Sequence, residues 1–203
     1  ATLGLLTSHT ATITDNDAAP VVQFDVAVSA VDESSGAVFV SVSLGAVSGL
    51  DVEVPFTAGG TATDPDDYSV SGSPLVISAG STSVALTLTI VDDLIDEAQE
   101  TVILTLGVPV NASLGANGVH AVRVNDNDAA PVVQFDLASS AVLEGAGAHA
   151  MTISLDAVSG LDVTVPFTVN GTAVDPADYG IDVSPVVIAA GSQSVLVNLT
   201  LVD

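Results

Sequence analysis

A single block of sequence recurs along this chain at a fixed spacing of 111 residues. The segment DNDAAPVVQFD occupies residues 15–25 and again residues 126–136, and the motifs VSGLDV, VPFT and DPDDY or DPADY recur at the same spacing. When residues 21–92 are aligned with residues 132–203 without gaps, 45 of the 72 positions are identical. A period of this length is too long for one unit of a solenoid and matches a complete small domain. The sequence therefore predicts a tandem array of similar domains.

The repeat register divides the chain into three parts. Residues 18–128 form one whole repeat, which we call the middle repeat, and residues 129–203 form the first five predicted strands of the next, the third repeat. Residues 1–17 align with residues 112–128, with His9 opposite His120, so they are expected to be the last strand of a preceding repeat. The chain is thus predicted to be a window on a longer array.

Apolar and polar residues alternate along the middle repeat, which predicts half-buried β-strands. Val40, Val42 and Leu44 would lie on one face of a strand, whereas Ser41 and Ser43 would lie on the opposite face. We expect strands at residues 21–31, 37–44, 51–57, 68–77, 83–91, 99–106 and 119–125. Seven short strands between Gly, Pro, Asn and Asp turns are typical of an immunoglobulin-like sandwich. The predicted fold class is all-β, with tandem immunoglobulin-like, seven-stranded antiparallel β-sandwiches.

The charge of the chain is strongly unbalanced, with 25 acidic residues, one basic residue and a formal net charge of −24. High net charge marks disorder when apolar residues are few, but here 48% of the residues are hydrophobic. The carboxylates therefore belong to a folded protein, and either bound cations or a salty medium must offset them. Nucleic acid and anionic membranes are excluded as partners because their binding depends on Lys and Arg. No apolar run is long enough to insert into a membrane.

The acidic residues are concentrated in loops. They lie at Asp32 and Glu33, at Asp64, Asp66 and Asp67, at Asp92, Asp93, Asp96 and Glu97, and at Asp126 and Asp128. A salt-adapted surface would also spread acids along the strand faces, which here carry Ser and Thr. Ca²⁺ takes about 6 to 8 oxygen ligands in a flexible geometry that loops can supply, whereas zinc prefers His or Cys. Calcium binding is the favoured interpretation, and turn capping by Asp and salt adaptation are the alternatives.

Several of these motifs together resemble the Calx-beta family, and the match covers essentially the whole chain. The motifs are IVDDLIDEAQE at residues 90–100, GTATDPDDY at residues 60–68, Glu33, and the closing DND at residues 126–128. Family members that bind calcium use carboxylates from these loops. The resemblance implies Ca²⁺ ligands at Glu33, Asp67, Asp92, Asp93, Glu97, Asp126 and Asp128, with the Ile95 carbonyl as a further ligand.

The repeat register extends this implied set to the flanking parts of the chain. Asp15 and Asp17 lie at the first repeat junction beside Pro20, where an ion would stiffen the connection and where a simple hinge is the alternative. In the third repeat Glu144, Asp178 and Asp203 match Glu33, Asp67 and Asp92. Two positions depart from the pattern. Leu94 stands where the strongest binders carry an acid, and Leu143 replaces Asp32.

No motif of an enzyme is evident. His9, His120 and His149 lie in no nucleophile pattern, and the chain has few aromatic residues to form the platforms of a glycosidase site. We expect a non-enzymatic, calcium-binding structural module of a secreted or cell-surface protein, in which Ca²⁺ stiffens an array used in adhesion, matrix or filament formation. Its expected partners are neighbouring repeats of the same chain and further copies in a filament or matrix. The alternatives are a calcium sensor that changes interdomain geometry, and strand exchange between chains.

Overall fold

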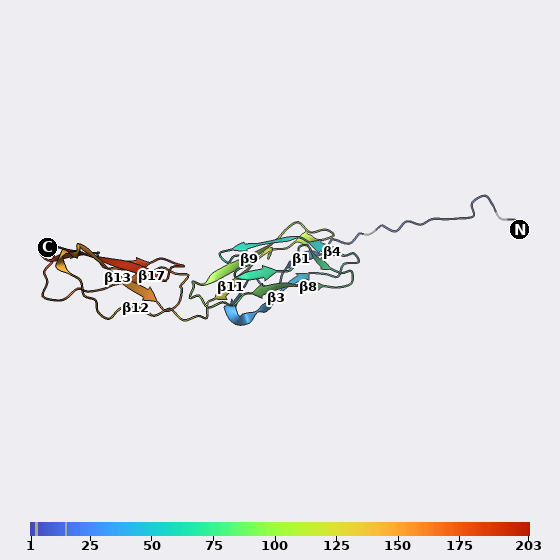
Figure 1. The fold of residues 1–203 in the computed structure, drawn as a ribbon. Helices are drawn as coiled ribbons and strands as arrows, with labels where there is room; N and C mark the ends of the chain where they lie inside the picture. The colour runs from blue at the N-terminus through green and yellow to red at the C-terminus, as the bar shows by residue number, and fades with distance from the viewer. Residues whose placement is uncertain (3, 15) are drawn as a thin grey trace.

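The computed structural model describes residues 1–2, 4–14 and 16–203 and is almost entirely β-structure. Figure 1 shows the middle repeat at the centre, the third repeat on one side and an extended N-terminal segment on the other. The described residues before Val21 form no strand, and a single strand without partners is not stable in water. The assignment of residues 1–17 to a preceding repeat therefore stays a prediction. No helix among the described residues is long and apolar enough to cross a membrane.

The middle repeat is a two-layer sandwich. One sheet has five strands in the order β10-β1-β3-β8-β6, the other has four in the order β2-β11-β9-β5, and β4 pairs with β7. Most neighbours are antiparallel, but β10 runs parallel to β1, and β2 runs parallel to β11. The elements are β1 (Val21–Phe24), β2 (Val28–Asp32), the 3-10 helix η1 (Glu33–Ser35), β3 (Ala37–Leu44), β4 (Val52–Val54), β5 (Phe56–Gly60), β6 (Tyr68–Val70), β7 (Leu75–Ile77), β8 (Ser83–Ile90), β9 (Glu100–Leu106), β10 (Ser113–Leu114) and β11 (Val119–Asn125).

The predicted all-β sandwich is confirmed, but three of the predicted strands are each broken in two. Residues 21–31 divide into β1 and β2, which belong to different sheets. Residues 51–57 divide at Pro55 into β4 and β5, and residues 68–77 divide before Leu75 into β6 and β7. Proline has no N–H to donate to a sheet, so Pro55 and Pro74 fall at these breaks.

The core of the middle repeat lies between the two sheets. Phe24, Val42 and Leu88 from the first sheet and Leu104 and Val122 from the second are all fully buried. These residues lie on the face that the alternating pattern predicts to be buried, and the residues between them are half-buried or exposed. Burial of apolar area is the main stabilising contribution to such a sandwich.

The third repeat contains a single four-stranded sheet in the order β12-β13-β17-β15, together with the pair β14-β16. Its elements are β12 (Val133–Phe135), the 3-10 helix η2 (Glu144–Ala146), β13 (Ala148–Leu155), β14 (Val163–Val165), β15 (Tyr179–Ile181), β16 (Val186–Ile188) and β17 (Ser194–Leu201). Five residues form its buried core, namely Ile153, Leu155, Val165, Ile188 and Val197. This sheet corresponds to the β1-β3-β8-β6 layer of the middle repeat.

Candidate metal centre

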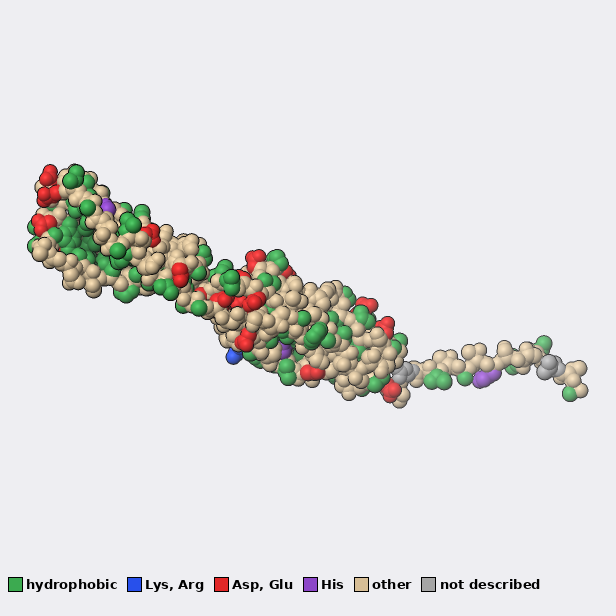
Figure 2. All heavy atoms as spheres, turned by 60° about the horizontal axis from the view of Figure 1, so that its bottom comes forward, with side chains coloured by type: hydrophobic (Ala, Val, Ile, Leu, Met, Phe, Trp, Pro, Cys, Tyr) green, Lys and Arg blue, Asp and Glu red, His purple; other side chains and the backbone are tan. Residues whose placement is uncertain are grey.

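Four segments that carry carboxylates meet at the end of the middle repeat that faces the third repeat. Strand β11 lies between β2 and β9, so the ends of β2 and β11 adjoin the start of β9, with Asn125 opposite Asp32 and Val124 opposite Glu100. The loop after β8 and the loop before β6 lie side by side because Tyr68 pairs with Ile90, and the hydrogen bond from Asp93 to Glu33 joins them to the end of β2. Figure 2 shows acidic side chains gathered where the two repeats meet.

The first acidic cluster consists of Glu33, Asp126 and Asp128. One carboxylate oxygen from each lies within 4.8 Å of the others. Glu33 is in η1 and is only 8% exposed, and its Oε1 accepts a hydrogen bond from the backbone N–H of Asp93 at 3.4 Å. Asp128 Oδ2 is buried and has no hydrogen-bond partner in the described part of the chain. A buried carboxylate oxygen without a partner is unfavourable unless a cation or water lies against it.

The second acidic cluster consists of Asp67, Glu97 and Glu100, again with one oxygen of each within 4.8 Å of the others. Asp67 also accepts hydrogen bonds from the backbone N–H and the hydroxyl of Thr63, at 2.6 and 2.9 Å. Glu100 was not among the predicted ligands. The alternating pattern of β9 could have indicated that Glu100 faces inward, because Val102, Leu104 and Leu106 on the same face are buried. A glutamate at an inward-facing position usually requires a charged or polar partner.

The two clusters are adjacent and match the size of a hard cation. Glu33 from the first and Asp67, Glu97 and Glu100 from the second line a common cavity of about 10 Å³, which is close to the volume that one water-sized sphere needs. Ca²⁺ binds oxygens at about 2.3 to 2.6 Å, so two ligands of one ion lie no more than about 5 Å apart. Both clusters satisfy this limit, and all of their donor atoms are carboxylate oxygens.

The clusters raise the proton affinity of their own members. Burial, followed by the charges of Asp93, Asp126 and Asp128, raises the pKa of Glu33 to about 7. Burial, with Asp67 and Glu97 nearby, likewise raises the pKa of Glu100 to about 7.

The other members shift in the same direction. Burial first and neighbouring carboxylates second raise the pKa of Glu97 and the pKa of Asp128 above their ordinary values. Negative charges that are out of water and close to one another are unfavourable, and a proton or a metal ion relieves both effects. The chain has one basic residue, Arg123, against 25 acids, so it cannot supply this compensation itself.

Asp92, Asp93 and Ile95 lie in the loop between β8 and β9, beside the first cluster. Asp93 Oδ1 accepts the backbone N–H of Ile95 at 2.7 Å, which closes a tight turn. Asp92 Oδ1 accepts a hydrogen bond from the Asn127 side chain at 3.3 Å, and this bond joins the loop to the segment after β11. Neither aspartate belongs to a three-residue cluster, so their roles as ligands stay predictions.

Comparison with known proteins supports these assignments of fold. The Calx-beta domain family model matches residues 15–128 and again residues 126–203. The chain belongs to the Calx-beta domain family.

The solved structures that are similar to the chain share its fold. CBD12 from CALX1.2 is 21% identical with a TM-score of 0.50, and the match covers 89% of this chain and 74% of that chain. The calcium binding domain CBD12 of CALX1.1 is 20% identical with a TM-score of 0.51, over 90% of this chain and 76% of that chain. No curated protein is significantly similar to this chain in sequence.

The matching carboxylates of the third Calx-beta repeat form no three-residue cluster among the described residues, so their roles as ligands stay predictions. Glu144, Asp178 and Asp203 are all exposed, and the described residues of this repeat contain no group of three acids within ligand distance. Asp178 accepts the backbone N–H of Val174 at 2.7 Å, as Asp67 does from Thr63. Turn capping therefore accounts for Asp178, whereas Asp67 both caps a turn and contributes to a cluster.

The predicted ligands at the first junction lie away from both clusters. Asp15 is outside the described residues. Asp17 is exposed and lines a hollow with residues 18–20 and 47–50 and with Asn111, at the other end of the middle Calx-beta repeat. The role of this junction as an ion site stays a prediction.

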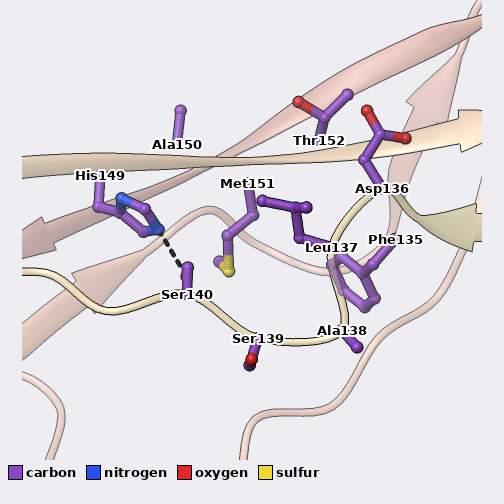
Figure 3. Close-up of a pocket in the computed structure, with 10 residues that line it drawn as sticks. All are labelled: Phe135, Asp136, Leu137, Ala138, Ser139, Ser140, His149, Ala150, Met151 and Thr152. Carbon is purple, nitrogen blue, oxygen red and sulfur yellow. Dashed lines mark hydrogen bonds between the residues drawn. The ribbon is translucent and has the colours of Figure 1, made fainter.

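A larger hollow in the third Calx-beta repeat, of about 520 Å³, contains no acidic cluster (Figure 3). It is lined by Phe135 and Met151 among others, and a hydrogen bond of 2.9 Å joins His149 Nε2 to Ser140 Oγ. In the middle repeat the corresponding face is covered by β11, where the ring of His120 packs 5.5 Å from that of Phe24. Of the described strands, only β12 and β13 line the hollow.

A Ser–His contact also occurs in the middle repeat, where Ser29 Oγ lies 2.9 Å from His120 Nε2. The other ring nitrogen of His120 faces the Val26 carbonyl at 2.7 Å, and His120 is only 1% exposed. A serine nucleophile needs an accessible hydroxyl and a histidine oriented by a carboxylate. The contact therefore has the features of a buried structural hydrogen bond.

Proposed function

We propose that the middle repeat binds Ca²⁺ at its two acidic clusters and that the chain is a calcium-stiffened structural module of a secreted or cell-surface array. One observation carries the proposal. Six carboxylates from four separate segments converge in two adjacent groups of ligand size, and among them Asp128 Oδ2 is buried without a partner. Glu33, Asp126 and Asp128 would hold one ion, and Asp67, Glu97 and Glu100 another, with Asp92, Asp93 and the Ile95 carbonyl as further ligands of the adjoining loop.

The proposed mechanism is thermodynamic linkage. In the unfolded chain the carboxylates are far apart, so Ca²⁺ binds the folded form selectively and stabilises it. Free ion at 100 times the dissociation constant stabilises the folded state by about 2.7 kcal/mol. Together the two ions would join η1, the β8–β9 loop, the end of β11 and the loop before β6, so the end of the repeat would become rigid. Rigid repeat ends are what an extended array for adhesion, matrix or filament formation requires.

The proposed location is extracellular, and such a location requires only a low calcium affinity. Loop-borne carboxylate sites in extracellular modules bind Ca²⁺ with dissociation constants on the order of 10⁻⁴ to 10⁻³ M, a range matched to calcium outside cells. The proposed partners are neighbouring repeats and further copies of the protein, and the proposed role is structural and not catalytic.

A calcium sensor is the second candidate, and the position of the clusters favours it. Asp96 and Glu97 lie against Ser159 and Gly160 of the third repeat, so metal binding occurs beside the inter-repeat contact. Small-angle scattering of the chain with Ca²⁺ and with chelator separates the two functions. A large change in maximum dimension would favour sensing, and a constant dimension with higher stability would favour the structural role.

Thermal unfolding of the chain tests calcium binding directly. The Tm of the middle repeat is expected to be higher in millimolar CaCl₂ than in EDTA, and equimolar MgCl₂ is expected to have a smaller effect. Glu33→Gln should remove most of the increase because it removes a ligand from the first cluster. Glu53→Gln is the matched control, since Glu53 is exposed on β4. Identical unfolding curves in CaCl₂ and EDTA would refute the proposal.

A further inference from the structure

The third repeat contacts the acidic end of the middle repeat through residues 158–161, which we call the VSG loop. The backbone N–H of Gly160 donates to the Asp96 carbonyl at 3.0 Å, and Ser159 pairs with Asp96 as an isolated parallel bridge. The Ser159 hydroxyl lies 3.3 Å from the same carbonyl and 3.2 Å from Asp96 Oδ2. Ser159 is fully buried. The contact thus directs hydrogen-bond donors at both the backbone and the carboxylate of Asp96.

The VSG loop is held in shape by bonds within its own repeat. Ser159 Oγ accepts the N–H of Leu161 at 3.1 Å, and the Ser159 carbonyl accepts the N–H of Gly191 at 2.9 Å. Asp162 Oδ1 accepts the N–H of Ala190 at 2.9 Å. Because its backbone is fixed in this way, the loop loses little conformational freedom when it contacts Asp96.

The middle repeat has the matching loop with three corresponding internal bonds, and in addition its Ser48 hydroxyl donates to the Leu50 carbonyl at 2.7 Å. Ser48 Oγ accepts the N–H of Leu50 at 3.0 Å, the Ser48 carbonyl accepts the N–H of Gly80 at 2.9 Å, and Asp51 Oδ1 accepts the N–H of Ala79 at 2.8 Å. The geometry is therefore a property of the repeat and is not induced by Asp96. Around this second loop lies the hollow formed with Asp17, residues 18–20 and Asn111.

A side chain at Gly160 would have to displace the side chain of Glu97 at the contact. A Cβ at Gly160 would lie 2.7 Å from Glu97 Oε1 and 2.8 Å from Glu97 Cγ, which is closer than van der Waals contact allows. Its counterpart Gly49 has no atom within 4 Å of the same position. The two glycines thus have the same sequence context, but a side chain at Gly160 would contact Glu97 whereas one at Gly49 would contact no atom.

We propose that the VSG loop is a latch by which a repeat of this array docks on the Asp96 turn of the repeat before it, and that this contact fixes the angle between repeats without a metal ion. The covalent connection through residues 129–131 is one tether, and the VSG loop supplies a second, separate one. A single tether leaves rotation free, whereas two tethers restrict it. Hydrogen bonds to a carboxylate are among the stronger neutral-to-charged contacts, so the latch holds although the turn is acidic. The matching loop of the middle repeat, residues 47–50, would dock in the same way on the Asp96 turn of another repeat of this kind.

Spin-label distance measurements on the chain test this latch. The sequence has no cysteine, so labels at Thr57→Cys and Gln193→Cys, both on exposed residues, report one distance between the two repeats. The experiment is done in EDTA, so its outcome does not depend on whether the clusters bind calcium. The unmodified loop is expected to give a narrow distance distribution. Gly160→Val should at least double the width of this distribution, whereas the matched control Gly49→Val should leave it unchanged.

A milder pair of variants guards against misfolding. Ser159→Ala removes the hydroxyl that faces Asp96 and should broaden the distribution by less than Gly160→Val, whereas Ser48→Ala should not broaden it. Circular dichroism spectra should show the same β-content in all four variants. An unchanged width in both Gly160→Val and Ser159→Ala would overturn the latch, as would equal broadening by the Gly49 and Gly160 variants.

Discussion

The middle and third repeats carry nearly the same motifs but place them in different surroundings. Glu33 is 8% exposed and belongs to a cluster, whereas its counterpart Glu144 is exposed and does not. Phe24 is fully buried, whereas Phe135 is 49% exposed. The middle repeat has the second sheet, and β9 and β11 of that sheet bring Glu100, Asp126 and Asp128 to the site. Among the described residues, the turns are present in both repeats, whereas the acidic clusters occur where β9 and β11 of the second sheet adjoin the first.

The largest expected difference between the repeats concerns their phenylalanines. Phe24→Ala should destabilise the middle repeat by about 3 to 5 kcal/mol, because it leaves a cavity between the two sheets. Phe135→Ala should change the stability of the third repeat by about 1 kcal/mol or less, because the ring is half exposed. Urea unfolding followed by tyrosine fluorescence measures both, since Tyr68 and Tyr179 are the only tyrosines and a Tyr→Phe change at one isolates the other. Equal losses in the two repeats would break the comparison.

The second-largest expected difference is in calcium affinity, which Glu33 and Glu144 should affect to different extents. Glu33→Gln is expected to weaken Ca²⁺ binding by about tenfold or more, which corresponds to about 1.4 kcal/mol or more. Glu144→Gln is expected to have no effect, because Glu144 lies in the corresponding 3-10 turn η2 but belongs to no three-residue acidic cluster among the described residues. Isothermal titration of the chain with CaCl₂ gives both affinities. If Glu144→Gln weakens binding as much as Glu33→Gln does, the site is not confined to the middle repeat.

The third-largest expected effect is the change with pH in the free energy of unfolding of the middle repeat when EDTA removes divalent ions. The pKa of Glu33 and that of Glu100 are raised to about 7 in the folded protein, so the folded state binds protons more tightly than the unfolded chain. This contribution to stability is present below the ordinary pKa of glutamate and is lost as the pH rises to about 7 and above. The free energy of unfolding of the middle repeat in EDTA should therefore fall between pH 5 and pH 8, by on the order of 1 kcal/mol or more. Replacing both residues with Gln should flatten this dependence, and a stability that rises over the same range would contradict the assignment.

The smallest expected difference distinguishes turn capping from metal binding. Asp178→Ala should cost the third repeat about 1 kcal/mol through the lost hydrogen bond to Val174, with or without Ca²⁺. The cost of Asp67→Ala in the middle repeat should increase when Ca²⁺ is added, because Asp67 also belongs to the second cluster. The same urea experiment in CaCl₂ and in EDTA measures each change. A calcium-independent cost at Asp67 would indicate that it only caps a turn.

Much of the fold could be predicted from the sequence because strands and turns depend on local patterns. Alternation placed Val42 and Leu88 in the core, and Asp-rich loops placed the acids at strand ends. The change of sheet between β1 and β2 was not predicted, because alternation records the face of a strand but not the sheet to which it belongs. The pairing of Asp93 with Glu33, 60 residues apart in sequence, likewise depends on the packing of the two layers.

The sequence by itself determined that the protein is a repeated, acidic, all-β array of the Calx-beta family, because repeats, parity and charge are properties of the chain alone. Only the tertiary structure decided which carboxylates are close together. It added Glu100 to the acidic groups of the site, left Glu144 and Asp178 outside any three-residue cluster of the described residues, and placed Gly160 against Glu97. The physical reason is that ligand geometry and steric fit depend on distances of a few ångströms between segments far apart in the chain, and two identical motifs acquire different neighbours when different strands cover them.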